Sequence, residues 1–175
     1  MKSYSINDLM MNPFTKIGKE WGLVTAGTKE KCNTMTVSWG GVGVLWGKDV
    51  TYIFIRESRY TKGFIDAGEY FSLSFLDESY RPALTFAGTK TGRGIDKFAA
   101  AGLTPAFAEA DQEKAGAEAV IPYPAEASLV LLCRKMAAVP IGAETFIDAE
   151  IQPKWYGDHD MHTMYVGEII GILGE

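Results

Sequence analysis

The sequence has few residues that could form a disulfide framework or a metal centre. Its 175 residues include only two cysteines and two histidines. Cys32 and Cys133 lie far apart and form no CxxC pair, which excludes a thioredoxin-like motif and a zinc knuckle. We therefore expect both thiols to be reduced, with Cys133 in the core because it lies within the apolar run LVLLCRK.

Long hydrophobic runs and an excess of positive charge are also missing. No segment has the length and apolarity of a membrane span, and the amino-terminal residues MKSYSINDLMMNPFTK lack the apolar stretch of a secretory signal. Lysine and arginine number 17 against 22 aspartates and glutamates, a formal net charge of -5. Because nonspecific nucleic-acid binders depend on clustered cations, we expect a cytoplasmic protein without nucleic-acid or membrane partners.

Several catalytic signatures are absent as well. The chain contains no GxSxG nucleophile elbow, no P-loop and no GxGxxG fingerprint after a strand. Both histidines fall in the segment Asp158-His159-Asp160-Met161-His162, but no clear third ligand occurs elsewhere. This falls short of a closed zinc site, so we expect no metal.

The apolar residues that are present predict a single domain spanning residues 1–175, with mainly β structure. Apolar, β-branched and aromatic runs recur at six places, each typical of a strand: 21–26, 34–39, 50–56, 70–76, 128–134 and 163–173. Three short segments have helical character: 61–67, 79–87 with Ser79 as N-cap, and 93–101 with Gly102 as its stop. Such helices are too short for regular βαβ crossovers, so an antiparallel barrel with a few short peripheral helices is favoured. The segments 109–127 and 138–162 are interpreted as long irregular connections.

The segment CNTMTVSWGGVG, residues 32–43, predicts a strand with a polar face that runs into flexible backbone. Thr34, Thr36 and Ser38 alternate with apolar residues, so their hydroxyls share one side of the strand. Glycines at 40, 41 and 43 then permit a sharp turn or a close approach to another group. This arrangement suits a flat, polar ligand, although an ordinary edge strand ending in a glycine turn has the same pattern.

Two further segments are candidate anion sites. Residues 56–61, RESRYT, place two arginines and two hydroxyls at the start of the helical segment 61–67, where free N–H groups favour a phosphate. A helix cap with a solvated charged rim is the alternative interpretation. Residues 88–94, GTKTGRG, form a basic glycine-rich loop, which is a weaker indication because mobile basic loops are common.

In this order, the segments resemble a known family. The motifs NTMTVSW at 33–39, SRYT at 58–61, GTKTGRGIDKF at 88–98, LLCRK at 131–135 and a late histidine before Gly167-Glu168 are similar to those of flavin reductase-like proteins of the flavoredoxin type. The resemblance implies a Greek-key split β-barrel that forms a homodimer and binds FMN noncovalently near the dimer interface. It also implies an oxidoreductase that passes hydride or electrons from NAD(P)H, or from another donor, through the flavin to an acceptor.

The resemblance assigns site residues in three groups. The flavin ring would lie against Asn33, Thr34, Met35, Thr36, Ser38 and Trp39. The phosphate and ribityl chain would be held by Ser58, Arg59, Tyr60 and Thr61. The glycine-rich loop would close the pocket with Thr89, Lys90, Lys97 and Phe98.

Family members often carry a Gly-Asp-His motif before the last strand, and its histidine corresponds to His162, the catalytic candidate that would contact the nicotinamide. Here Asp160 and Met161 precede His162, so the motif is altered, while a Gly-Asp-His tripeptide ends at His159. A cation near N1 and O2 of the ring would stabilise the reduced flavin, and Lys90, Lys97 or a protonated His162 are the candidates.

Two other functions share these features. The first is a flavoredoxin-like electron carrier between protein partners, with little NAD(P)H activity. The second is a split-barrel protein that binds haem or a deazaflavin, or that serves only as a sensor or structural dimer. Haem would require an axial ligand, and neither histidine clearly lies on a strand that would supply one.

Overall fold

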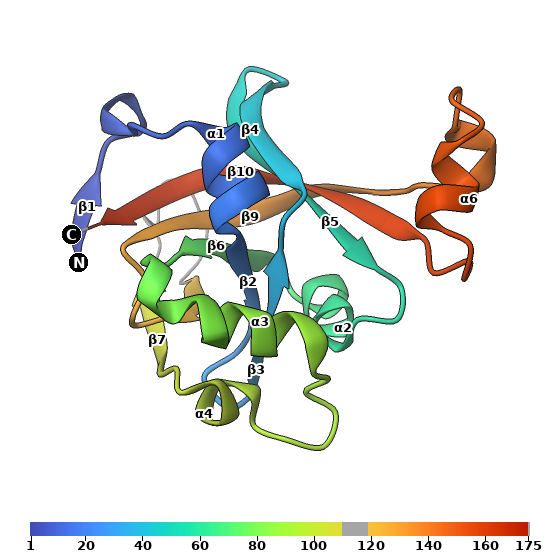
Figure 1. Cartoon of the computed structure of the whole chain (residues 1–175). Coiled ribbons are helices and arrows are strands. Elements are labelled where there is room, and N and C mark those ends of the chain that lie inside the picture. Colours follow the sequence, from blue (N-terminus) through green and yellow to red (C-terminus); the bar gives the residue numbers. More distant parts are fainter. Residues whose placement is uncertain (110–118, 175) are drawn as a thin grey trace.

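The computed structural model describes residues 1–109 and 119–174. Its main feature is an eight-stranded antiparallel sheet in the order β3-β2-β6-β9-β10-β5-β4, with β1 paired to β10 (Figure 1). The strands are β1 (Lys2–Tyr4), β2 (Gly22–Gly27), β3 (Cys32–Val37), β4 (Gly40–Leu45), β5 (Lys48–Arg56), β6 (Tyr70–Phe75), β9 (Leu129–Pro140) and β10 (His162–Gly174). A separate hairpin consists of β7 (Pro105–Glu109) and β8 (Val120–Pro124).

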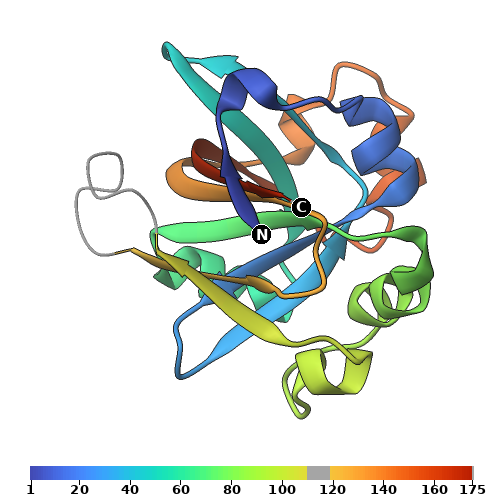
Figure 2. The same ribbon diagram turned by 90° about the vertical axis from the view of Figure 1, so that its left-hand side faces the viewer.

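The helices are short and peripheral. They are α1 (Pro13–Thr15), α2 (Tyr60–Ala67), α3 (Arg81–Thr89), α4 (Lys97–Ala101) and α6 (Ile151–Trp155), with brief 3₁₀ or π turns at Ile6–Asp8, Lys16–Glu20, Glu78–Tyr80 and Ala143–Thr145. Figure 1 shows α2, α3 and α4 around the β2–β3 end of the sheet, and α6 far from them beyond β9 and β10. The turned view in Figure 2 shows the amino and carboxyl ends close together, consistent with the pairing of β1 to the end of β10.

The sheet curls into a barrel that does not close. Strands β3 and β4 stand at the two ends of the strand order, yet only Ser38 and Trp39 connect them in the chain. A two-residue connection can span only a short distance, so the two ends of the sheet must approach each other. The resulting seam, bridged by Ser38 and Trp39, is the opening of the split barrel.

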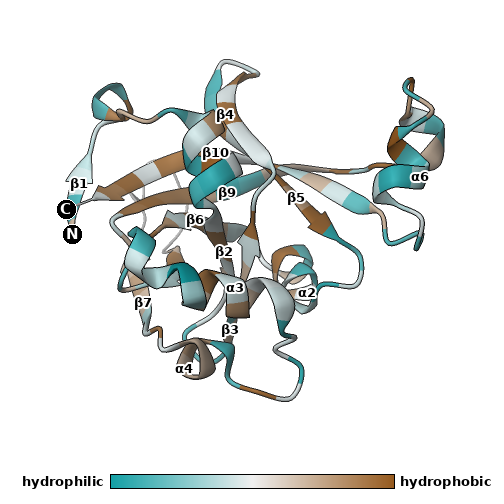
Figure 3. Cartoon of the chain, viewed as in Figure 1, coloured by the Kyte–Doolittle hydropathy of each residue, from teal (hydrophilic) through white to brown (hydrophobic). Residues whose placement is uncertain are grey.

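Both faces of the central strands are buried, which gives the fold two apolar layers. On β9, Leu131 and Cys133 belong to the cluster inside the barrel, whereas Val130 and Leu132 belong to the outer cluster with α3, α4 and β8. Because successive strand residues point to opposite faces, a strand covered on both sides is apolar along its length. Figure 3 shows this as brown segments along the central strands.

The mainly β, antiparallel fold with few short helices confirms the predicted class, and all six predicted strands are present with shifted ends. The glycine-rich segment after Trp39 is the strand β4 rather than a turn alone. An added Cβ at Gly40 would lie 2.5 Å from the carbonyl oxygen of Tyr52, so this glycine allows β4 and β5 to approach closely.

Other boundaries also differ from the predictions. Helix α3 begins at Arg81 after a 3₁₀ turn, with Tyr80 rather than Ser79 as its N-cap. The predicted connection 109–127 includes the strand β8, whose Ile121 is buried, while residues 110–118 lie outside the described part. Gly102 ends α4 in the left-handed conformation, as predicted.

Both cysteines are free, and Cys133 is fully buried. None of the described helices combines the length and apolarity required to cross a membrane.

Candidate functional site

A hollow of about 390 Å³ lies at the seam of the barrel. We call it the seam hollow, and its lining comprises Met35, Thr36, Val37, Ser38, Trp39, Phe54, Arg56, Ser58, Arg59, Trp155, Asp160 and His162. These residues come from β3, the β3–β4 connection, β5 and the turn after it, α6, and the segment that leads into the first residue of β10. These segments lie far apart in the sequence, and the fold brings them together.

A second, smaller hollow of about 200 Å³ adjoins the first. We call it the cation hollow, and it is lined by Met35, Ser58, Arg59, Tyr60, Thr61, Thr89, Lys90, Thr91 and Lys97. Met35, Ser58 and Arg59 line both hollows. One elongated ligand could therefore occupy the two together.

Two cations in the cation hollow are held by the same helix end. The guanidinium of Arg59 donates to the carbonyl of Gly88 (2.6 Å), and the ammonium of Lys97 donates to the carbonyl of Ala87 (2.8 Å). Both carbonyls belong to the last turn of α3, where the helix dipole favours positive charge. Among residues 1–109 and 119–174, no carboxylate forms an ion pair with either side chain.

Keeping Lys97 charged in this position costs free energy. Its side chain is buried at 4% exposure, and burial, with repulsion from Arg59, lowers its pKa to about 8. Burial also lowers the pKa of Arg59, although Asp160 opposes that shift. Because an anion beside these groups would favour their charged forms, the cation hollow is electrostatically suited to a phosphate.

Helix α2 begins at the same place. Its N-cap residue, Arg59, makes no side-chain capping hydrogen bond to the first turn. The buried hydroxyl of Thr61 accepts a hydrogen bond from the Asn33 amide (2.8 Å), which joins the helix to β3. The amino end of α2 thus faces the cation hollow without a capping side chain, in the arrangement that favours anions.

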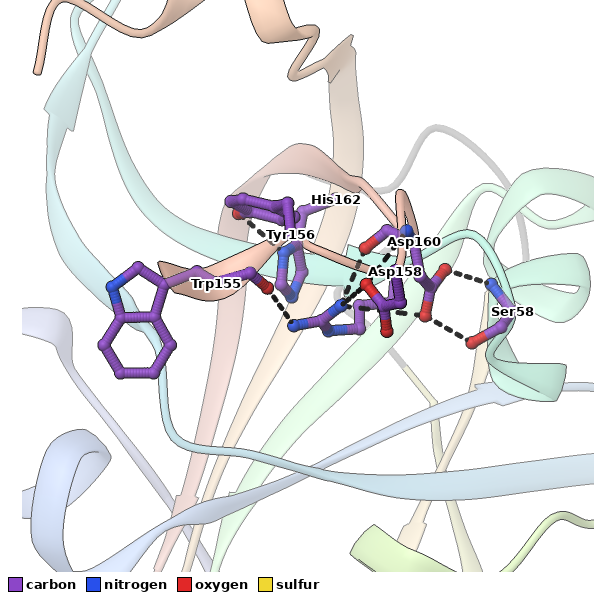
Figure 4. Close-up of polar contacts among 7 residues, drawn as sticks. Ser58, Trp155, Tyr156, Asp158, Asp160 and His162 are labelled. Carbon is purple, nitrogen blue, oxygen red and sulfur yellow. Dashed lines mark hydrogen bonds and ion pairs between the residues drawn. The ribbon is translucent and has the colours of Figure 1, made fainter. Parts of the chain in front are cut away.

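Ser58 is already engaged within the chain. Its backbone N–H and its hydroxyl both donate to the Asp160 carboxylate, at 3.0 and 2.6 Å (Figure 4). Its two donors are therefore not free for an anion in this arrangement. Arg59, Lys97 and Lys90 are the cations that line the hollow beside it.

Arg56 ties the segment before β10 to the end of β5. Its guanidinium donates to the carbonyls of Asp160 (2.8 Å) and Trp155 (2.9 Å) and forms an ion pair with Asp158 (3.4 Å). Its planar array of donors suits several acceptors at once. Figure 4 shows Trp155 on one side of His162 and Asp158 and Asp160 on the other.

His162 is the first residue of β10 and lies in the wall of the seam hollow. Its Nδ1 is 2.8 Å from the Tyr156 hydroxyl, and its ring lies 5.2 Å from that of Trp39. Burial, with the positive charge of Arg56, lowers its pKa to about 4. This pKa favours a neutral imidazole near pH 7 over the protonated His162 considered from the sequence, and Nε2 is the nitrogen left for the hollow.

The polar face expected on β3 is used by the protein itself. The Thr34 hydroxyl is fully buried, 3.0 Å from that of Thr25, and the Thr36 hydroxyl donates to the Leu84 carbonyl. The inference that this row of hydroxyls faces a ligand is therefore wrong for Thr34, which lines neither hollow. Thr36 and Ser38 do line the seam hollow, together with Met35 and Val37.

Most residues predicted for the site come together in these two hollows. They are Met35, Thr36, Ser38, Trp39, Ser58, Arg59, Tyr60, Thr61, Thr89, Lys90, Lys97 and His162. Asn33, Thr34 and Phe98 are buried and line neither hollow. His159 is exposed on the preceding turn, and the described residues contain no group of three potential metal ligands.

Sequence reasoning missed the framework behind His162. Tyr156, which stacks on Phe146 (5.4 Å between ring centroids), and Trp155, which packs edge-on against Trp39 (5.2 Å), lie in a segment interpreted as irregular. The clustering of aromatic residues just before β10 was the available signal. The spacing of these aromatic residues in the sequence gave no indication of which rings pack against each other.

Comparison with known proteins gives consistent results. The protein family described as "Flavin reductase like domain" matches this chain over residues 14–174. Among solved structures, flavoredoxin from Methanosarcina acetivorans superposes with a TM-score of 0.66 at 20% identity, over 100% of this chain and 76% of that chain. A search of curated proteins found no match.

Two more solved structures have similar folds. The FMN-binding protein from Thermus thermophilus with bound p-hydroxybenzaldehyde gives a TM-score of 0.64 at 18% identity, over 100% of this chain and 82% of that chain. Nitrilotriacetate monooxygenase component B from Bacillus cereus gives a TM-score of 0.66 at 19% identity, over 99% of this chain and 81% of that chain. At these identities the likeness establishes the shared fold.

Proposed function

The chain belongs to the flavin reductase like domain family, and from this membership we propose that it binds FMN noncovalently and acts as an oxidoreductase. It would pass hydride or electrons from NAD(P)H, or from another donor, to an acceptor. The bound flavin would supply the hydride- and electron-accepting chemistry. The protein supplies the binding, the orientation and the electrostatic environment.

The observation that carries this proposal is a pair of cations, the buried Lys97 and the half-buried Arg59, that form no ion pair with any carboxylate of the described residues. Arg59 and Lys97 line a hollow beside the uncapped amino end of α2. A phosphate group would relieve their mutual repulsion and the burial cost of Lys97. Lys90, exposed on the rim, would add a third cation.

The seam hollow fits the flat part of the same ligand. Met35, Val37 and Phe54 provide an apolar wall, and the indoles of Trp39 and Trp155 form its rim. His162 is held by Tyr156 as a neutral group that offers Nε2 to the hollow. Its role would be to position a donor or acceptor atom rather than to supply charge.

The absorption spectrum of the purified protein tests the proposal most directly. We expect a yellow protein with flavin bands, or a colourless one that gains them when FMN is added. A preparation that neither carries nor takes up FMN would contradict the proposal.

A flavoredoxin-like carrier is the second candidate function, and one feature favours it. The mouth of the seam hollow is rimmed by two partly exposed tryptophans, Trp39 at 39% and Trp155 at 46%. Exposed aromatic residues are common at protein interfaces, so a redox protein could dock over the flavin. Steady-state oxidation of NADH and NADPH, compared with reduction by a ferredoxin, separates the carrier from the reductase.

We also propose that the protein acts as a homodimer. The tip of the β4–β5 hairpin exposes Val44 and Trp46, at 71% and 62%. Trp46 has a φ of 53°, which a bulky side chain rarely adopts. A large apolar residue kept at a strained, exposed position supports a contact surface.

A further inference from the structure

Ser58, which the sequence motif assigns to a ligand phosphate, binds a carboxylate of the chain itself. Its backbone N–H donates to Oδ1 of Asp160 and its hydroxyl donates to Oδ2, at 3.0 and 2.6 Å (Figure 4). Ser58 lines both the seam hollow and the cation hollow. Two adjacent donors that bind two oxygens of one anion could equally bind a phosphate. The Asp160 carboxylate therefore occupies donors that a phosphate in these hollows could use.

The negative charge of Asp160 also acts on the cations of the site. Asp160 lines the seam hollow together with Arg59, and its charge opposes the lowering of the Arg59 pKa that burial causes. Its side chain is only 20% exposed, and solvent ions screen partly buried charges weakly. A phosphate that enters the cation hollow is therefore attracted by Arg59 and Lys97 but repelled by Asp160.

Asp160 has a second partner within reach. Oδ2 of its carboxylate is 3.9 Å from Nη1 of Arg56, the same nitrogen that donates to the Asp160 carbonyl. The backbone of this segment is held independently of the carboxylate, because the carbonyl of Met161 accepts a hydrogen bond from the Glu57 N–H (3.0 Å). A change of side-chain rotamer could therefore move the carboxylate from Ser58 to Arg56 while the backbone stays in place.

We propose that Asp160 competes with the ligand phosphate for Ser58, and that its carboxylate moves to Arg56 when the phosphate binds. The inference rests on the proposed function, because it takes FMN as the ligand. Both donors of Ser58 then pass to the phosphate of FMN, and the charge of Asp160 is paired with Arg56. The consequence is a flavin that is bound less tightly than the cations of the site alone would allow.

Riboflavin separates this role from a general effect on the site. It has the ring and the ribityl chain of FMN but no phosphate, so it leaves the Asp160 carboxylate on Ser58. Asp160 should therefore lower the affinity for FMN without lowering the affinity for riboflavin.

Titrations of the full chain with FMN and with riboflavin, each followed by the quenching of its fluorescence, test the proposal. Asp160→Asn keeps the shape of the side chain and removes its charge, and we expect it to raise the affinity for FMN about tenfold. The affinity for riboflavin should change less than about twofold. Asp160→Ala, which also removes the acceptor oxygens, should raise the affinity for FMN at least as much.

Asp158→Asn is the matched control. Asp158 also forms an ion pair with Arg56 (3.4 Å), but its side chain is 66% exposed and lines neither hollow. Its neutralisation should change the affinity for FMN less than about twofold. A gain as large as that of Asp160→Asn would show a general effect of net charge and would overturn the inference.

An unchanged affinity for FMN in Asp160→Asn would also overturn the inference, and a reduced affinity would show instead that Asp160 helps to hold the ligand. Equal gains for FMN and riboflavin would contradict competition for the phosphate, since riboflavin has none. In each of these cases FMN binding by the wild-type protein survives. Failure of the wild-type protein to bind FMN at all would instead refute the proposed function.

Discussion

Arg59 and Lys97 bind neighbouring carbonyl oxygens, those of Gly88 and Ala87, at the end of helix α3. One residue precedes α2 and the other begins α4, so three helices meet at this point. The α3 carbonyls orient both cations without neutralising them. The site therefore keeps unbalanced positive charge, and several measurable properties follow.

The first prediction concerns the pH dependence of FMN binding. Lys97 has a pKa of about 8, lowered mainly by burial, so the free protein loses this positive charge as the pH rises above 8. We expect the affinity for FMN to fall about tenfold between pH 7.5 and 10, because the phosphate binds the protonated lysine. Titrations of the protein with FMN at several pH values measure this affinity.

Lys97→Met serves as the test variant. It should bind FMN weakly at pH 7.5 with little further loss at high pH, yet be more stable than wild type in urea by about 1 kcal/mol, because a buried charge has been removed. In the wild-type protein the unfolded state keeps the lysine proton up to its ordinary pKa, so stability should rise as the pH increases above 8. An unchanged pH profile in Lys97→Met would refute this role.

The second prediction is that His162 is neutral near pH 7. Its pKa of about 4 lies below the ordinary value, chiefly because of burial, so in the folded protein this ring should stay in its neutral form, with a single N–H proton, between pH 8 and 5. The unfolded state does bind a proton in the lower part of that range, and stability should therefore fall as the pH drops from 6.5 to 4. The His159→Gln variant leaves one histidine, and its ring resonances report the titration by NMR.

Tyr156→Phe provides the companion variant. It removes the hydroxyl 2.8 Å from Nδ1 and leaves the aromatic packing in place. We expect a mixture of ring tautomers in ¹⁵N spectra and a loss of about 1 kcal/mol in unfolding free energy. A single unchanged tautomer would show that Tyr156 does not orient the histidine.

The third prediction concerns Lys90, which lies exposed on the rim of the cation hollow. Lys90→Ala should lower the FMN reduction potential or weaken FMN binding, since a nearby cation stabilises the reduced, anionic flavin. Potentiometry and titration measure the two effects. If both values equal those of the wild type, Lys90 has no such role.

The fourth prediction compares two glycines of one loop. An added Cβ at Gly92 would lie 2.3 Å from Oδ1 of Asn33 and 3.2 Å from Cδ1 of Tyr60, whereas at Gly94 it would meet nothing within 4 Å. Gly92→Ala should therefore cost about 1–3 kcal/mol in urea denaturation and weaken FMN binding, because it displaces the residues that border α2. Gly94→Ala should change stability by less than about 0.5 kcal/mol. Equal effects would contradict the contact.

The fifth prediction tests the proposed dimer. Trp46→Lys places a charge at the exposed tip of the β4–β5 hairpin and should convert dimers to monomers in light scattering. Phe14→Lys, at another exposed position (85%), is the control and should leave the mass unchanged. A dimer that persists in Trp46→Lys would place the interface elsewhere.

Local sequence patterns were sufficient to predict much of the architecture. The strands around Val24, Ile53 and Leu131 were predictable because their residues are apolar and β-branched in short runs. Helix α4 ends at Gly102 for a purely local reason, the left-handed conformation that glycine permits. The strand β4 was missed because its glycines indicate a turn locally, while its pairing with β5 depends on Tyr52, a residue of the partner strand.

The sequence by itself determined the fold class and most of the residues around the site, because motif order and local propensity are properties of the chain. Tertiary structure decided how those residues are used. It turned the Thr34 hydroxyl inward, set Asp160 against Ser58, and brought Arg59 and Lys97 to one helix end. It also lowered the pKa of His162, because pKa values depend on burial and on charges from distant segments. These relationships arise from strand order and register over long sequence separations, and no local pattern encodes them.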